Sequence, residues 1–180
     1  VVSLGADQAI CPGGTVTLDA GNAGATYLWS TGATTQTITV STLGNYSVAV
    51  TNTNGCVGRD TVAVISKPLP TVNAGPDLSK CPGDSVTIDA GAGFAAYLWN
   101  NGATTQTIRV SAAAQYIVTV TNAEGCSASD TVNVTNNALP VVSLGNDRDI
   151  CTSDTITLDA GNVGSTYLWS TGATTQTITV

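Results

Sequence analysis

The sequence predicts an all-β protein built from tandem repeats of 70 residues, and three observations lead to this prediction. One stretch recurs at a fixed interval: residues 27–40 return at 97–110 and at 167–180, and blocks 21–40 and 161–180 agree at 18 of 20 positions. Short segments alternate between apolar and polar residues with the period of two that strands require, and none has a helical period. Turn residues separate these segments at the spacing typical of two-sheet sandwiches.

Each repeat reads as a series of short strands joined by turns of Gly, Pro and Asn, which supply fixed or positive φ angles. In the first copy the expected strands are residues 1–4, 15–19, 26–29, 36–40, 44–50 and 60–64. Alternation sends Val16, Leu18 and Ile38 inward and leaves the threonine hydroxyls outward. About seven strands in a repeat predict tandem immunoglobulin-like β-sandwich repeats, in which the chain enters at one end and leaves at the other.

The period predicts two full repeats, residues 1–70 and 71–140, and an incomplete third repeat, residues 141–180, with only its first strands. Residues 67–70 contain two prolines, which stiffen the connection to the second repeat. The third repeat lacks its closing strands, so either the sequence is an excerpt or another chain supplies them; we favour the excerpt. Consistent with this, no signal peptide opens the sequence and no sorting tail closes it.

The core of each repeat is expected to be aliphatic around one aromatic residue. Trp29, Trp99 and Trp169 come from the recurring stretch, and Tyr46 and Tyr116 begin a strand as the tyrosine corner of such sandwiches does. Burying one tryptophan removes about 200 Å² from water, which is worth about 5 kcal/mol as an upper value. That is a large share of the stability of so small a domain.

Composition excludes several classes of function. The net charge is −7 with only 5 Lys and Arg, which excludes a basic nucleic-acid surface, and the short apolar runs exclude a membrane span. The chain has no His, the commonest general base, and its carboxylates recur with the repeat as structural parts do, so we expect no catalytic residue. We expect no cofactor or metal; the alternative is calcium, whose nearest acidic cluster, residues 147–149, occurs in one copy only.

The five cysteines also follow the period, at Cys11, Cys56, Cys81, Cys126 and Cys151. Their spacing does not suit zinc, so we expect disulfides and an oxidising, extracellular compartment. A bond across repeats, Cys11–Cys126, is favoured, because the turn at 11 should lie at the exit end of its sandwich and the hairpins at 56 and 126 at the entry ends. Bonds within a repeat, Cys11–Cys56 and Cys81–Cys126, are the alternative, and reduced thiols are the third reading.

The order Cys-Pro-Gly, Leu-Asp-Ala-Gly, Tyr-Leu-Trp-Ser, Gly-Asn-Tyr-Ser-Val and Asn-Gly-Cys resembles the Ig-like and PKD-like repeats of large cell-surface proteins of Bacteroidota. The resemblance implies gliding or adhesion proteins exported by the type IX secretion system. It also implies O-glycosylation at Asp-Ser/Thr-aliphatic triplets, carried here by Thr61, Ser85, Thr131 and Thr155. A strand that begins with a capping Asp gives the same triplet without any glycan.

The expected function is a non-catalytic structural segment of a long extracellular surface adhesin, stalk or filament. The alternative is a set of spacer or carbohydrate-binding modules in a secreted multidomain enzyme, which would need an exposed aromatic residue in each copy. The expected partners are neighbouring repeats of the same chain, identical chains in a filament, and surface glycans or proteins. Nucleic acid and a membrane span are not expected.

Overall fold

The computed structural model describes all 180 residues and contains fourteen strands. No helix is present, and so none that could cross a membrane. Contacts between residues divide the chain into two compact units, Val1–Leu78 with Ser85–Val134, and Ser79–Asp84 with Thr135–Val180. The first unit contains two hydrophobic cores, one formed by residues between 4 and 64 and the other by residues between 74 and 134.

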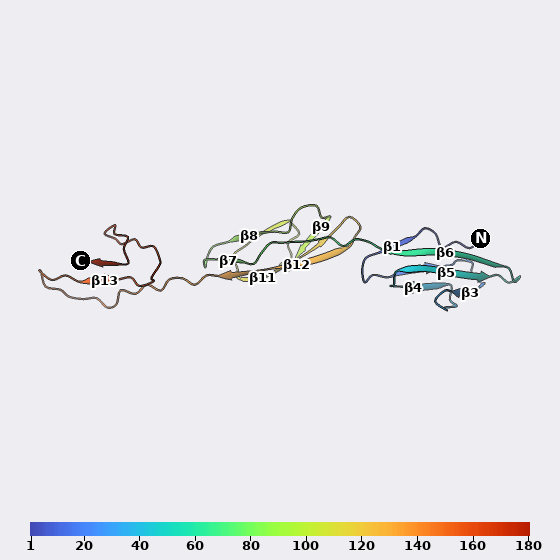
Figure 1. Ribbon diagram of the computed structural model, residues 1–180, viewed down its shortest axis with the longest axis horizontal. Helices are drawn as coiled ribbons and strands as arrows, with labels where there is room; N and C mark the ends of the chain where they lie inside the picture. The colour runs from blue at the N-terminus through green and yellow to red at the C-terminus, as the bar shows by residue number, and fades with distance from the viewer. The chain divides into compact units, whose positions relative to one another are not determined.

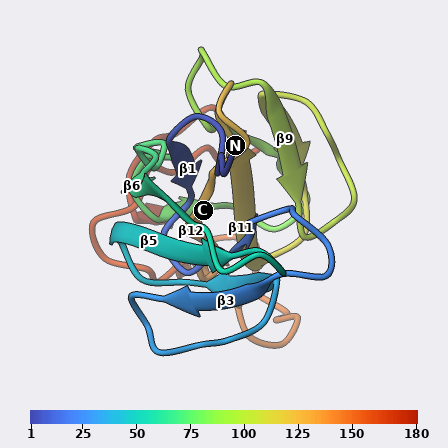
Figure 2. The same cartoon turned by 90° about the vertical axis from the view of Figure 1, so that its right-hand side faces the viewer.

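The first repeat forms six strands in two sheets (Figure 1). One sheet has the order β1–β6–β5–β3 and the other pairs β2 with β4. The strands are β1 (Gln8–Ile10), β2 (Val16–Asp19), β3 (Thr26–Trp29), β4 (Thr37–Val40), β5 (Gly44–Thr51) and β6 (Val57–Ser66). Figure 2 shows β3 beside β5, in agreement with their antiparallel pairing. In this repeat β1 and β6 pair in parallel, which places the end of β1 beside the end of β6.

The second repeat has the same order of strands, with one sheet β7–β12–β11–β9 and a second pairing β10 with β8. Its strands are β7 (Leu78–Lys80), β8 (Val86–Asp89), β9 (Ala96–Trp99), β10 (Thr107–Val110), β11 (Ala114–Thr121) and β12 (Ser127–Asn136). Both repeats are therefore immunoglobulin-like sandwiches. Residues 141–180 add a single pair, β13 (Thr157–Asp159) with β14 (Thr177–Thr179).

The aromatic side chains lie in the cores of the two complete sandwiches. Trp29 is 2% exposed and Trp99 is 1% exposed, and each ring nitrogen donates to a carbonyl oxygen six residues further on. Tyr46 is also buried, and its hydroxyl donates to the carbonyl of Thr42 at 2.8 Å; Tyr116 makes the same bond to Ala112 at 3.2 Å. This is the contact that defines a tyrosine corner.

The opening of the repeat differs from the expectation. Residues 1–4 form no strand; the Leu4 backbone N–H instead donates to the Asp60 carboxylate at 2.7 Å, so a side chain takes the place of a ladder partner. The first strand is β1, which pairs with β6 through residues that show no alternation. Each complete repeat thus has six strands rather than about seven, and β6 begins at Val57 rather than at residue 60.

The third repeat buries much less than its two counterparts. None of its side chains belongs to the buried core, Trp169 is half-buried, and Leu168 is 83% exposed. Beside Trp169 lies a hollow of about 370 Å³ that Val142 and Leu144 also line. The Trp169 ring still donates to the Thr175 carbonyl at 2.8 Å, so the local turn forms without the rest of the sandwich. The repeat boundaries at 70 and 140 remain a prediction.

Candidate functional site

The parallel pairing of β1 with β6 brings Cys11 to the end of the first sandwich where the chain leaves it. Ile10 lies opposite Ser66 in the register, and the Lys67 N–H donates to the Ile10 carbonyl at 2.8 Å. Cys11 follows Ile10 directly and so lies next to residues 67–70, which lead into the second repeat. The Gly14 N–H closes the turn after it by donating to the Cys11 carbonyl at 2.8 Å.

The second half of the site is the hairpin between β11 and β12, residues 122–126. The side-chain oxygen of Asn122 accepts the Cys126 N–H at 2.8 Å, and Gly125, at a φ of 81°, completes the turn with a bond to the Asn122 carbonyl. Only a residue without a side chain adopts that φ readily. With its oxygen used inside the hairpin, the Asn122 amide nitrogen donates to the Pro68 carbonyl at 2.9 Å.

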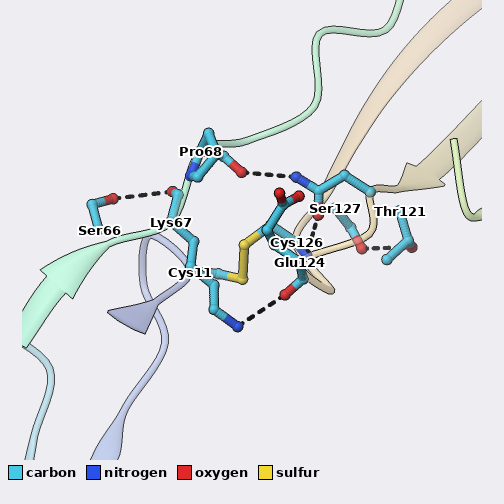
Figure 3. The surroundings of a disulfide bond; sticks show 9 residues. Cys11, Ser66, Lys67, Pro68, Thr121, Glu124, Cys126 and Ser127 are labelled. Atoms are coloured by element: carbon cyan, nitrogen blue, oxygen red, sulfur yellow. Dashed lines mark hydrogen bonds between the residues drawn. A yellow bond between two sulfur atoms is a disulfide. The ribbon is translucent and has the colours of Figure 1, made fainter. Parts of the chain in front are cut away.

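A disulfide joins Cys11 to Cys126 across the two repeats, with Cα atoms 5.5 Å apart and a sequence separation of 115. Figure 3 shows the bond between the turn after β1 and the hairpin, beside residues 66–68. The Lys67 ammonium adds a third link, a 2.9 Å hydrogen bond to the Glu124 carbonyl. Cys126 is only 1% exposed. All of these residues belong to the first unit, so two sandwiches share one covalent joint.

The other three cysteines, Cys56, Cys81 and Cys151, are free and exposed. The structure therefore contains the bond across repeats and neither of the two bonds within a repeat. The geometry of the first sandwich gives the reason: the turn after β1 and the hairpin between β5 and β6 lie at opposite ends of the paired strands. The eight-residue β5 alone spans about 25 Å, far beyond the reach of a cystine.

The four candidate glycosylation positions lie in different surroundings. Thr61 and Thr155 are exposed, and Thr131 is half-buried. Ser85 is also half-buried, and its hydroxyl accepts a 2.6 Å hydrogen bond from the Arg109 guanidinium. Thr61 and Thr131 lie within the strands β6 and β12, so a glycan there would stand on a sheet rather than on a loop. Their modification stays a prediction.

The recurring carboxylates tie turns and strand ends together. The Asp19 carboxylate accepts hydrogen bonds from the Gln36 amide and the Gly21 N–H, which hold the pKa of that carboxyl below its usual range. Asp89 has the same pair of donors in the second repeat, Gln106 and Gly91, and its pKa is lowered for the same reason.

Hydrogen bonds from Leu4 and then Thr61 likewise lower the pKa of Asp60. Each of these carboxyls is thus held as an anion that accepts N–H groups. No group of three or more Cys, Asp or Glu side chains lies close enough together to hold a metal ion.

Sequence reasoning missed the polar part of the joint. Lys67, Asn122 and Glu124 were not singled out, although Asn122 stands three residues before the Gly-Cys pair, as Asn52 does in the first repeat. That spacing signals a turn closed by an Asn side chain. It contains no information on the contact with Pro68, because the partner lies 54 residues away in sequence.

The family model described as "Protein of unknown function (DUF642)" matches residues 72–180. A comparison with curated protein sequences finds no match.

Three solved structures that resemble the chain span different shares of it. DIP-gamma IG1+IG2 is 11% identical with a TM-score of 0.35, over 74% of this chain and 94% of that one. The N-terminal eight Ig domains of DSCAM isoform 1.30.30 are 16% identical with a TM-score of 0.37, over 88% and 27%. The Bacteroides ovatus protein SGBP-B, in complex with a mixed-linkage heptasaccharide, is 15% identical with a TM-score of 0.24, over 86% and 50%. All three TM-scores lie below 0.5, so the assignment of an immunoglobulin-like fold rests on the sheets of the chain itself.

Proposed function

The chain belongs to the family described as "Protein of unknown function (DUF642)", and we propose that it is a load-bearing structural segment of an extracellular surface protein, without catalytic activity of its own. In this proposal the repeats act as a spacer or filament, and its distinctive part is the covalent joint between sandwiches. The observation that carries it is the disulfide Cys11–Cys126, which links the two repeats instead of closing either one.

The joint opposes both bending and stretching at the place where a string of domains is usually weakest. A linker of four residues alone would leave two sandwiches free to move against each other. Here the disulfide fixes the turn after β1 to the next hairpin, and the bonds from Asn122 to the Pro68 carbonyl and from the Lys67 ammonium fix the linker to it. Repeats that interact only with their neighbours can also be multiplied without redesign.

The chemistry of the same bond supports an extracellular location, since disulfides persist in oxidising compartments and are rare in the cytosol. The resemblance to Ig-like and PKD-like repeats of Bacteroidota supports a cell-surface protein exported by the type IX secretion system. Glycans at Thr61 and Thr155 would suit such a surface, because both side chains are exposed. The partners under this proposal are neighbouring repeats, identical chains and surface molecules.

Pulling single molecules from their two ends tests the load-bearing role. With the bond intact, the 115 chain steps from Cys11 to Cys126 cannot extend, whatever unfolds inside the loop. At about 3.5 Å per residue, they hide about 400 Å of contour length. We expect this length to appear only after reduction of the bond, and the intact molecule to extend through its terminal segments alone.

The matched controls are the Cys11→Ser variant, which should release the full length without reductant, and the Cys81→Ser variant, which should behave as the unmodified protein. Equal contour lengths before and after reduction would contradict the proposal. The alternative, a sugar-binding module, is tested on a glycan array with the intact chain. Trp29 and Trp99 are buried and offer no platform for a sugar ring, so we expect no binding.

A further inference from the structure

The polar side chains at the joint lie beside the disulfide and bond across it to the other repeat. We propose that Asn122 and Lys67 are positioning residues for disulfide formation: their side chains hold the linker on the hairpin, so that Cys126 pairs with Cys11. This inference rests on the proposed function, because it concerns how the covalent joint comes to form. All four residues belong to the first unit.

The unfolded chain does not favour the observed pair of cysteines. Closing a loop costs more entropy as the loop becomes longer, so that nearby cysteines meet more readily than distant ones. On this basis Cys11 would meet Cys56 about four times as often as it meets Cys126. The structure nevertheless joins Cys11 to Cys126, over a sequence separation of 115. Contacts of the folded repeats must therefore select the partner.

Folding of the first sandwich removes the competing pair without supplying the correct one. The end of β1 lies beside the end of β6, whereas Cys56 precedes the start of β6. Cys11 is thus left next to the linker, residues 67–70, through which the second sandwich is attached. A short linker alone permits many orientations of two domains. Further contacts must hold the hairpin of residues 122–126 against the turn after β1.

Asn122 connects the two halves of the joint through one half-buried side chain. Its oxygen accepts the Cys126 N–H at 2.8 Å, and its amide nitrogen donates to the Pro68 carbonyl at 2.9 Å. The preceding residue, Lys67, donates its N–H at 2.8 Å to the carbonyl of Ile10, which lies directly before the other cysteine of the joint. These bonds link the backbones of the two cysteines without using either sulfur.

The Lys67 ammonium adds a second contact across the joint, a 2.9 Å hydrogen bond to the Glu124 carbonyl. Figure 3 shows this bond and the bond to the Pro68 carbonyl on either side of the disulfide. Because one donor comes from the linker and the other from the hairpin, rotation of one repeat against the other breaks both bonds. Neither bond needs the disulfide, so both can form between reduced repeats and raise the effective concentration of one thiol at the other.

The joint also determines which thiol an oxidant meets first. Cys11 is half-buried, whereas Cys126 is 1% exposed. With oxidised glutathione as the oxidant, the Cys11 thiolate attacks one of its sulfurs, forms a mixed disulfide and releases one glutathione thiolate. The Cys126 thiolate then attacks the Cys11 sulfur and releases the second glutathione. Two protein thiols lose two electrons and two protons in total, and one glutathione disulfide becomes two glutathione molecules.

The test measures the equilibrium of the Cys11–Cys126 bond with glutathione in the full chain, well below its Tm. The protein is incubated at several ratios of reduced to oxidised glutathione, quenched with acid, alkylated and mapped, which gives the effective concentration of the two thiols. Asn122→Asp keeps an oxygen for the Cys126 N–H but loses the donor to the Pro68 carbonyl. We expect the effective concentration to fall about two- to tenfold, which corresponds to one hydrogen bond.

Two further substitutions complete the design. The matched control is Asn52→Asp, which changes the equivalent contact to the Cys56 N–H in a hairpin outside the joint, and it should leave the equilibrium unchanged. Lys67→Met removes the ammonium and keeps an unbranched apolar side chain, so the effective concentration should again fall, and Lys67→Arg should restore most of it. The Lys67 variants keep the test decisive if Asn122→Asp does not fold.

The inference is overturned if Asn122→Asp and Lys67→Met have the same effective concentration as the unsubstituted protein, or if Asn52→Asp lowers it equally. A purely structural role of Asn122 would lower the Tm of the reduced protein and leave the glutathione equilibrium unchanged. When the unsubstituted protein forms the Cys11–Cys126 bond, these results refute only this inference. Absence of that bond from the unsubstituted protein would refute the proposed function.

Discussion

Loss of the disulfide between the first two repeats should lower the stability of both repeats. The Cys11→Ser substitution opens a loop of 115 positions and leaves Cys126 as a small buried thiol, so the core loses no volume. In the chain-entropy model, a disulfide that closes a loop of this length stabilises the folded state relative to the unfolded state by about 5 kcal/mol. The substitution removes this stabilisation. For the two repeats that the loop encloses, this corresponds to a fall of about 10–20 °C in Tm.

Scanning calorimetry, with far-UV circular dichroism as a second probe, measures this effect. The matched control is Cys81→Ser, which changes the equivalent turn of the second repeat where the structure has no bond. We expect the control to change Tm little and the Cys11→Ser variant to separate the unfolding of the two repeats. A fall in Cys11→Ser no larger than that in the control would refute the reasoning.

Three further predictions concern the sandwiches themselves. Trp99→Ala should cost about 3–5 kcal/mol in denaturant unfolding, whereas Trp169→Ala should cost far less because Trp169 is half-buried. Tyr46→Phe removes a hydroxyl that bonds at 2.6 and 2.8 Å and should cost about 1 kcal/mol, measured in the same way. The folded-state pKa of Asp60 is lowered by the Leu4 N–H, so its stabilisation is complete above the unfolded-state pKa of about 3.9 and disappears as pH falls through the folded value. Tm should therefore stay level from pH 7 to about 5 and fall below about 4, with a smaller fall in Asp60→Asn.

Much of the sandwich could be predicted because its information is local. The alternation in residues 44–50 predicted β5, and the recurring stretch predicted β3 and β4, with Trp29 as the last residue of β3. The short β1 could not be predicted in the same way. Its residues, Gln8–Ile10, show no alternation, and their parallel partner lies 56 positions further along the chain.

The different surroundings of Cys56 and Cys126 show where local information ends. Both follow an Asn-x-x-Gly stretch, and both hairpins have the same internal hydrogen bonds. One thiol is nevertheless exposed and the other is bonded and buried. Cys126 is buried because it contacts the neighbouring repeat. The sequence around the hairpin does not predict this contact; only the spacing of all five cysteines along the chain does.

A non-reducing peptide map of the native protein tests the central claim most directly. We expect one disulfide-linked peptide that contains Cys11 and Cys126, with the two residues in different repeats. This result would establish that adjacent sandwiches are covalently joined. Peptides that link Cys11 to Cys56 and Cys81 to Cys126 would contradict the account, because each repeat would then be closed on itself and the joint would be an ordinary short linker.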